Sequence, residues 1–585
     1  MPTISAHSGV ADGVDESNGV GGIEPGKRLV RVGDKGLSLG ERMANHFYRL
    51  TWRTPLHAMR LKGRYPLKLL AVPVDPMPGN RQAGQWMLSG TVRWRGESIA
   101  IDAITFGDDG VSAPFADYLH RFEWLRDLSA VGDRAGCAPV AEKLMRAWLA
   151  GHGETVSDAG WRPDLVGWRT LFWACHAPLI LSSTDLVYRS SVLNALARGA
   201  RHLDRGADRA TQGNARLAAW TGIVAAGLLV PGGDPRRTFG EAGLQRAILS
   251  GFSDDGGVVS RSPVDQADAV VLLSMLAQVY DARREAVPEF IASLQLRAVA
   301  ALHGVTLGDG ALSSWQGSGP VSADHIKQVV AASGVRTRPL RQARDWGYQR
   351  MAGGATVVIA DAAPPPASRI GGGGSASTLA FELSDGAQRL IINCGGARGS
   401  SAMAADLANG LRTTAAHSTL VVGDSNSTAI HADGTLGAGV RAVELDRQEA
   451  EGGSRIDASH DGYAKRFGFI HKRMLALSAN GRELRGEDAL LPAPRRRKAS
   501  SARFAIRFHL APGVEVTPTA DGLAALLRID HGPLWQFRCR GGALTIEESL
   551  SIDSAGRPVP TLQFVVSGEA PAGGATVGWL LKRAG

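Results

Sequence analysis

The sequence has little of what a disulfide framework, a zinc knuckle or a membrane span requires. Its four cysteines, Cys137, Cys175, Cys394 and Cys539, lie far apart among 585 residues and form no CxxC pair. This spacing predicts small buried thiols, not a disulfide framework or a zinc knuckle. The longest apolar run, 217–230, is well short of the roughly 20 residues that a membrane-spanning helix needs. We therefore expect no integral membrane segment.

Targeting and nucleotide-binding signals are also missing. The chain begins MPTISAHSGVADG, with no basic start followed by an apolar run, so we predict no secretory signal peptide. The glycines at 371–374 neither follow a strand nor open a helix, which argues against a nucleotide-binding loop. No internal repeat of short period is present in the sequence.

The charge is basic. The chain carries 65 Lys and Arg against 56 Asp and Glu, a formal net charge of +9, with a pI of about 9.6. This balance favours a polyanionic partner: nucleic acid, an acidic glycan or an anionic membrane surface. No nucleic-acid motif accompanies the charge, so we expect no nucleic-acid partner.

Apolar content of 44% is ordinary for a soluble globular protein, and 585 residues are too many for one core. Residues 1–36 are Gly-rich and polar, so we predict a disordered N-terminal extension. Short alternating pieces within 66–105, such as 90–94, predict a small hairpin, and from Phe115 to about Gly304 helical patterns follow one another with short loops. That pattern favours stacked antiparallel helix pairs.

Helix signals recur through this part. Ser183-Thr184-Asp185 supplies a cap and an early acid before a helical apolar face. The run 217–230 is apolar nearly all round, so it should be buried on several sides, and Pro231 ends it. Pro288 opens a further helix that we expect to run to about Leu302.

Beyond residue 340 the apolar period becomes that of strands. Residues 504–510 alternate apolar and polar side chains, which predicts a half-buried strand. Alternation at 535–539 and 544–546, on either side of Gly541-Gly542, predicts a hairpin. We predict an antiparallel β-sandwich over 340–585.

Seven short phrases stand in a fixed order in the chain. They are Gly347-Tyr348-Gln349-Arg350, Leu379–Leu383, Asn393-Cys394-Gly395, Arg412–Leu420 with its AAHSTL, His460–Arg473 (HDGYAKRFGFIHKR), Gly486-Glu487-Asp488 and Arg507–Leu510. Together they resemble the heparinase II/III-like family over roughly residues 40–565. The resemblance implies an α+β multidomain chain, with an incomplete α/α toroid of helical hairpins over 37–335 followed by the antiparallel β-sandwich.

Characterised members of that family are polysaccharide lyases, and their cleft lies between toroid and sandwich. The resemblance therefore implies β-elimination on an acidic, uronate-containing glycan, in which a base removes a proton and an acid, commonly a Tyr, protonates the leaving oxygen. The implied partner is an acidic polysaccharide of a Gram-negative cell envelope or capsule. The family's work implies the cell envelope or periplasm, while the N-terminus leaves the cytoplasm open.

The family's catalytic set is not matched. Where the lyases carry an Asn-His pair, this chain has Asn214 and Ala215. Where they carry a Tyr after Ser-Pro, it has Asp265, followed by Gln266 in place of a His. The missing base and acid put elimination by the family's usual groups in doubt.

The zinc site of some members is degraded as well. The family's ligand positions correspond to Ser375, Asn393 and His417, of which His417 alone is a good zinc ligand. We therefore predict no zinc site and no cofactor.

The remaining polar side chains are our site candidates. The catalytic candidates are His417, Arg412, Asp265 and Tyr463, and the substrate-binding candidates are Asn214, Arg216, Gln266, Arg261, Arg466 and His460. Five of these candidates have a structural alternative. His417 would be hydrogen-bonded at a strand end, and Asp265 would be a helix N-terminal acid. Tyr463 and Arg466 would form a cross-strand pair. Arg412 would hold either a substrate carboxylate or Asp424.

Two hypotheses remain open. The first is a polysaccharide lyase with a rebuilt site that uses His417 and Arg412 with Asp265 or Tyr463. The second is a catalytically silent relative that binds an acidic glycan in the retained cleft.

Overall fold

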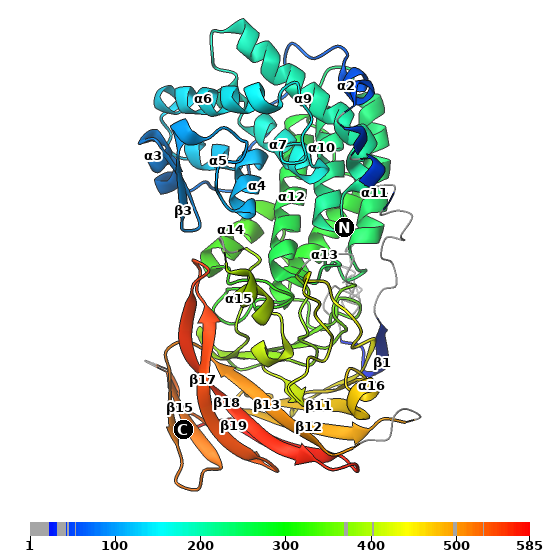
Figure 1. Cartoon of the computed structure of the whole chain (residues 1–585), viewed down its shortest axis with the longest axis vertical. Helices are drawn as coiled ribbons and strands as arrows, with labels where there is room; N and C mark the ends of the chain where they lie inside the picture. The colour runs from blue at the N-terminus through cyan, green and yellow to red at the C-terminus, as the bar shows by residue number, and fades with distance from the viewer. Residues whose placement is uncertain are drawn as a thin grey trace, which may run out of the picture.

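The computed structural model describes residues 23–31, 43, 46–48, 50–52, 54–367, 373–399, 403–494, 500–529 and 532–584. The helices form one end of the molecule and two large antiparallel sheets form the other (Figure 1). The predicted order of helices first and antiparallel sheets second is confirmed. The last helix of the helical half ends at Ser333 and the next strand begins at Tyr348, while the predicted domain limits stay a proposal.

The helical half contains α2 (Pro55–Leu61), α3 (Arg81–Leu88), α4 (Ala113–Arg121), α5 (Trp124–Ser129), α6 (Arg134–His152), α7 (Pro163–Cys175), α8 (Ala177–Ile180), α9 (Leu186–Gly206), α10 (Asn214–Leu229), α11 (Asp234–Gly251), α12 (Pro263–Ala282), α13 (Glu289–Gly304) and α14 (Ala323–Ser333). A small hairpin of β2 (Thr91–Trp94) and β3 (Glu97–Ala100) lies beside them. None of the described helices is both long and apolar enough to cross a membrane.

Local sequence signals fix where these helices begin. Helix α9 begins at the predicted start signal 183–185, and its cap is the expected early acid: the Asp185 side chain accepts hydrogen bonds from the amides of Val187 and Tyr188. Ser262 caps α12 by accepting from the Asp265 amide, and Pro263 occupies the first turn. Helix α10 corresponds to the all-apolar run and contacts α7, α9, α11 and α12, so it is the central helix.

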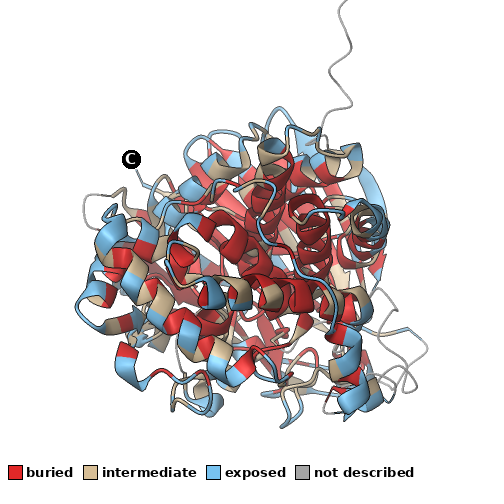
Figure 2. Ribbon diagram, turned by 90° about the horizontal axis from the view of Figure 1, so that it is seen from above, coloured by how far each residue is buried: buried red, intermediate tan, exposed pale blue. Residues whose placement is uncertain are grey.

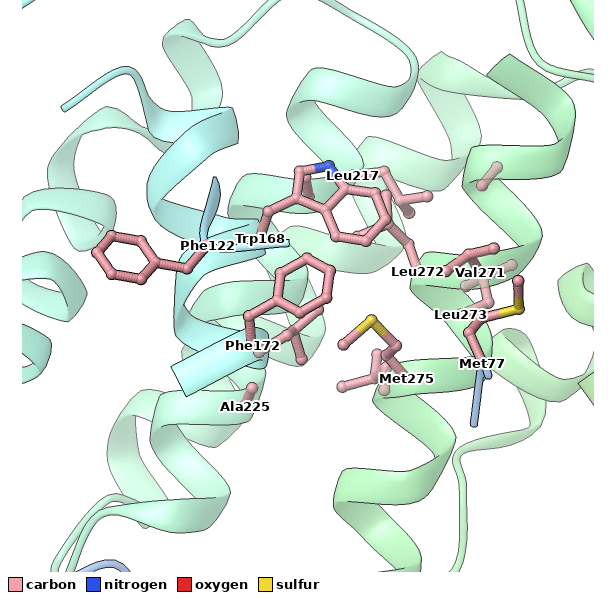
Figure 3. Packing of buried hydrophobic residues seen from close by; sticks show 14 of the residues in the cluster. Met77, Phe122, Trp168, Phe172, Leu217, Ala225, Val271, Leu272, Leu273 and Met275 are labelled. Carbon is pink, nitrogen blue, oxygen red and sulfur yellow. The ribbon is translucent and has the colours of Figure 1, made fainter. Parts of the chain in front are cut away.

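The core of the helical half is close-packed around α7, α10 and α12. Seen from above, its middle is buried and its rim exposed (Figure 2). Figure 3 shows Phe172 of α7 and Met275 of α12 pointing toward one another. Where α7 crosses α10, a Cβ on Gly167 would lie 2.0 Å from the Ala218 carbonyl oxygen. Glycine therefore allows the two helix backbones to touch.

The sheet half is a two-layer sandwich. One layer has nine strands in the order β1-β9-β10-β11-β12-β19-β16-β15-β14, and the other has the order β17-β18-β13-β7-β6-β5-β4, with β8 paired to β13. The first layer contains β1 (Gly26–Arg31), β9 (Ala442–Ala450), β10 (Gly453–His460), β11 (Phe469–Ser478), β12 (Glu483–Pro492), β14 (Val514–Pro518), β15 (Ala524–Ile529), β16 (Trp535–Arg540) and β19 (Ala575–Arg583).

The second layer contains β4 (Tyr348–Gly353), β5 (Thr356–Asp361), β6 (Phe381–Asp385), β7 (Gln388–Ile392), β8 (Leu420–Val422), β13 (Ala502–Leu510), β17 (Ala543–Ile552) and β18 (Pro558–Ala570). Aromatic rings from both layers meet in the core. Phe381 stacks on Trp579 at 5.4 Å between ring centroids, and Phe537 stacks on Phe564 at 4.7 Å. These contacts hold the two sheets face to face.

The hairpin predicted around Gly541-Gly542 is wrong. Strand β16 pairs with β15 and β19 in the nine-stranded layer, whereas β17 pairs with β18 in the other layer. Gly541, with φ of +98°, lies where the chain passes from one layer to the other. Alternation shows which side chains face the core, but it does not identify the strand beside them.

The prediction of disorder over 1–36 is wrong at residues 26–31. These residues form β1, which pairs with β9 along its whole length, and Val30 is buried. The amide of Glu24 donates to the Gln342 side chain at 2.9 Å. An existing sheet edge supplies hydrogen-bond partners that a compositional argument does not include. Residues 1–22 and 32–36 lie outside the described residues.

Candidate functional site

The helical half and the sandwich meet at a buried network around Asp361. Arg261 donates to the Asp361 carboxylate at 2.5 Å and to the carbonyl oxygens of Trp346 and Pro364 at 2.8 Å each. Asp361 also accepts from Gln316 at 3.2 Å and from Ser377 at 2.7 Å. Arg261 is thus buried and fully engaged by protein groups. Its predicted contact with substrate is wrong because it joins the two halves of the protein.

Beside this network, the first turns of α10 and α12 face a loop of the sandwich half. Asp265 forms an ion pair with Arg398 and accepts from the Ser260 hydroxyl at 2.5 Å. Asn214 donates to the Asp265 carbonyl oxygen at 2.5 Å, and its Oδ1 atom is buried without a partner among the described residues. The predicted candidates Asn214 and Asp265 are therefore neighbours.

Asp268 lies one turn beyond Asp265 on α12. Burial is the largest influence on its carboxyl group and raises the pKa to about 6, although Arg121 and Arg95 act in the opposite direction. Asp265 raises it further. This carboxyl group therefore changes charge close to neutral pH, which is frequent at functional sites. We call Asn214, Asp265, Asp268 and Arg398 the junction cluster.

Asp268 and Arg398 were not among the residues predicted from the sequence. A spacing of three residues places Asp268 on the same helix face as Asp265, so helical geometry alone could have found it. Arg398 follows β7 in a Gly-rich stretch, and only the folded chain brings it to α12.

His417 is not part of the junction cluster. It is 1% exposed, and its Nδ1 atom is 2.7 Å from the Thr413 carbonyl oxygen. Burial lowers the pKa of His417 to about 4, so the ring is neutral at pH 7. These contacts favour the structural alternative, a histidine hydrogen-bonded just before a strand.

Arg466 lies in a short helix, α16 (Ala464–Phe467), and Tyr463 is the residue just before it, so the predicted cross-strand pair is wrong. Tyr463 is 1% exposed and donates to the Leu420 carbonyl oxygen at 2.8 Å, and burial raises the pKa of its hydroxyl. Arg466 is exposed and stacks on the Phe467 ring at 5.2 Å. His460 is buried, with its Nε2 atom 3.2 Å from Nδ1 of His471.

Arg412 does not contact Asp424, one of its two predicted partners, among the described residues. Its Nε atom donates to the Gly374 carbonyl oxygen at 2.8 Å, while Asp424 is exposed in a turn with φ of +49°. The Nη2 atom of Arg412 is buried and has no acceptor within the described part of the chain. The predicted contact of Arg412 with a substrate carboxylate stays a prediction.

The remaining two candidates support the helical half. Gln266 is fully buried, accepts from the Val258 amide at 2.8 Å and donates to the carbonyl oxygens of Gly256 and Ala298 at 2.9 Å each. Its predicted substrate contact is therefore wrong. Arg216 donates to the Ala210 carbonyl oxygen at 3.1 Å.

The residues at the family's zinc positions do not fit zinc. Asn393 donates to the Glu382 carboxylate at 2.9 Å and accepts from the Ser418 amide at 3.0 Å, so both ends of its amide are used. Ser375 offers a hydroxyl group where a zinc site has a histidine, carboxylate or thiolate. Across the described ranges, no three His, Cys, Asp or Glu side chains gather in a group able to hold a metal ion.

Comparison with known proteins shows which family has this architecture. Residues 335–580 match the family profile described as heparinase II/III-like, C-terminal. FtsZ-localized protein C of Caulobacter vibrioides is 30% identical over 556 residues, which cover 92% of this chain and 95% of that protein. The chain belongs to the heparinase II/III-like family.

Two solved structures carry the same fold at low identity. The crystal structure of heparinase III is 14% identical with a TM-score of 0.68, and the match covers 93% of this chain and 89% of that one. Heparan sulfate lyase HepC of Pedobacter heparinus is 16% identical with a TM-score of 0.59, over 93% and 88% of the two chains. The helical half is thus an incomplete α/α toroid and the sheet half its β-sandwich, as the sequence predicts.

Proposed function

We propose that this heparinase II/III-like protein is a catalytically silent relative of the lyases that binds an acidic polysaccharide between toroid and sandwich. One observation carries the proposal: the candidate base His417 and the candidate acid Tyr463 are each 1% exposed and hydrogen-bonded to a backbone carbonyl oxygen. A catalytic base must come within hydrogen-bond reach of the proton that it removes. Neither side chain meets that condition.

The groups around the junction cluster support glycan binding. Arg398 and Arg412 come from the sandwich half, and Arg121 comes from the toroid. A sugar carboxylate accepts hydrogen bonds from guanidinium groups.

The test mixes purified protein with a panel of acidic glycans and measures both binding and the absorbance of unsaturated uronate. We expect saturable binding to at least one glycan without turnover. Arg412→Ala should weaken that binding, while Arg557→Ala, which removes an exposed arginine between β17 and β18, serves as the matched control. Turnover that His417→Ala abolishes would establish the lyase alternative, and no binding to any glycan would refute both hypotheses.

The relative of known location favours a second function. Because the 30% identity to FtsZ-localized protein C extends over 92% of this chain, we infer that this protein also accumulates where FtsZ does. A fluorescent fusion should therefore form a midcell band that disappears when FtsZ is depleted. An even distribution in dividing cells would contradict this inference.

A further inference from the structure

A second polar cluster lies inside the toroid, away from the junction cluster. A cavity of about 540 Å³ is bordered by the loop 66–80, the end of α5, the start of α6 and the link between α7 and α8. We call it the α5–α7 cavity. Its apolar lining includes Val72, Val74, Met77, Cys137 and Leu179. A cavity of this size and polarity is typical of small-molecule sites.

Three side chains on its wall form a hydrogen-bonded line. The Ser129 hydroxyl oxygen is 2.9 Å from Nδ1 of His176, and Nε2 of His176 is 3.2 Å from the Asp75 carboxylate. They come from three separate segments: the last residue of α5, the link after α7 and the loop before α3. A serine, an imidazole and a carboxylate in this order are the components of a nucleophilic hydrolase site.

The charge of Asp75 determines which nitrogen of His176 carries the proton. Burial acts to raise the pKa of Asp75, but hydrogen bonds from His176 and Arg126 and the charge of Arg126 lower it to about 2. Asp75 is therefore a carboxylate that only accepts, so the His176 proton lies on Nε2. Nδ1 then carries the lone pair that accepts the Ser129 proton.

The cluster is held rigidly. Arg126 donates to both carboxylate oxygens of Asp75, at 2.8 and 3.0 Å. The Phe172 ring, visible in Figure 3, stacks on the His176 ring at 6.4 Å between centroids and lies 5.0 Å from the Arg126 guanidinium. Arg126 is thus a positioning residue. Ser129, in contrast, is exposed, so a substrate can reach its hydroxyl group.

We propose that Ser129, His176 and Asp75 form an esterase site for small carboxylic esters with a short apolar acyl group. The Ser129 oxygen attacks the ester carbonyl carbon while its proton passes to Nδ1 of His176. The tetrahedral intermediate collapses, and the leaving alcohol takes that proton. Water then hydrolyses the acyl-serine, giving the carboxylic acid and free Ser129, so atoms and charge balance without a further reactant.

Stabilisation of the intermediate's oxyanion comes from the amide groups of Arg134 and Ala135 at the start of α6 in this proposal. Asp133 and Arg134 border the cavity, and Asp133 caps α6 by accepting from the Gly136 amide at 3.1 Å. The leading amide groups of a helix have no carbonyl partner within it and carry partial positive charge. Amide donors aimed at developing charge are a large part of acyl-transfer catalysis.

The test treats the full-length protein with a fluorophosphonate probe and locates the label by mass spectrometry. We expect labelling at Ser129. In parallel, p-nitrophenyl acetate and butyrate should be hydrolysed faster than the decanoate, because the cavity is small. Ser129→Ala should abolish labelling and lower the hydrolysis rate about 10²–10⁴-fold, as should His176→Gln.

Ser89→Ala, which changes an exposed serine at the end of α3, is the matched control and should keep the wild-type rate. Asp75 is left intact because its loss would leave the largely buried Arg126 without its carboxylate partner. Thermal unfolding of each variant confirms that it is folded. Failure of the folded wild-type protein to label at Ser129, or hydrolysis unchanged in Ser129→Ala, would overturn the proposal.

Discussion

At single residues, the chemical type of a side chain does not predict whether it can reach a substrate. His417 and Tyr463 have the residue types of a base and an acid, but both are buried behind backbone carbonyl groups. Asn214 and Asp265 were chosen by the resemblance to family motifs that open helices, and they are neighbours. A helix start is visible in a sequence because caps and prolines mark it. The burial of His417 and Tyr463 depends on segments that are distant in the chain, so the residues around them in the sequence do not predict it.

Arg261 is a test of a buried charge pair that joins toroid and sandwich. Arg261→Met should lower the free energy of unfolding by about 3–5 kcal/mol, because Asp361 would remain buried without a cationic partner. Denaturant unfolding followed by far-UV circular dichroism measures the change. Arg557→Met removes an exposed ion pair with Asp553 and should change the free energy by less than about 1 kcal/mol. Equal effects of the two substitutions would contradict the structural assignment of Arg261.

Asp268 gives a prediction with a pH signature. Its folded pKa of about 6 exceeds the ordinary value of about 3.9. Ionisation of Asp268 therefore destabilises the folded protein: the cost is absent at low pH and grows as pH rises from about 4 to 6. Asp268→Asn should therefore stabilise the protein by roughly 2–3 kcal/mol at pH 7 and have little effect at pH 4. Unfolding midpoints at both pH values provide the measurement, and a pH-independent difference would refute it.

Helices and strands differ in how far the sequence defined them. Helix α9 begins directly after the predicted start signal 183–185, because a helix cap is a contact within four residues of the chain. Strand β13 covers the predicted stretch 504–510, but the partners of β16 and β17 were wrong. Strand pairing is a long-range choice that alternation does not encode. The same limit hid β1, whose partner β9 lies more than 400 residues away.

The crossing of α7 and α10 yields the prediction for elements. Gly167→Ala should lower the free energy of unfolding by about 1–3 kcal/mol, because its methyl group would meet the backbone of Ala218. Gly151→Ala, in the exposed face of α6 with 3.7 Å to its nearest neighbour, is the control. It should be neutral or stabilising by up to about 1 kcal/mol, since alanine favours helix. Thermal unfolding compares the two, and a tolerated Gly167→Ala would disprove the close contact.

At the scale of the whole molecule, the order of motifs was the strongest sequence observation. No phrase alone identified the fold, yet their order along roughly 40–565 gave the toroid and sandwich that the solved relatives share. A fold tolerates many substitutions if apolar patterns persist, whereas a site requires specific groups at specific distances. That difference explains why the architecture was predictable and the junction cluster was only partly so.

Ten histidines of this protein are shielded from water to different degrees: eight are buried, His303 is half-buried and His325 lies at the surface. This shielding lowers the pKa of His57, His120, His152, His202, His303, His325, His417, His460, His471 and His509. Each such group binds a proton in the unfolded chain at a higher pH than in the folded one. Each neutral histidine therefore contributes to the free energy of unfolding above the unfolded pKa of about 6.5, and this contribution is lost as pH falls below that value.

The size of this loss makes acid sensitivity a prediction for the molecule as a whole. His120, His202 and His509, with pKa values of about 3, should each remove roughly 2 kcal/mol by pH 5. Asp268 acts in the opposite direction, but it is one group against ten. The urea midpoint should fall steeply between pH 6.5 and 5. His509→Gln should make that fall shallower by the contribution of one histidine, even if the substitution lowers the midpoint at pH 7. A midpoint that stays constant over this interval would show that the histidines are accessible to protons in the folded state.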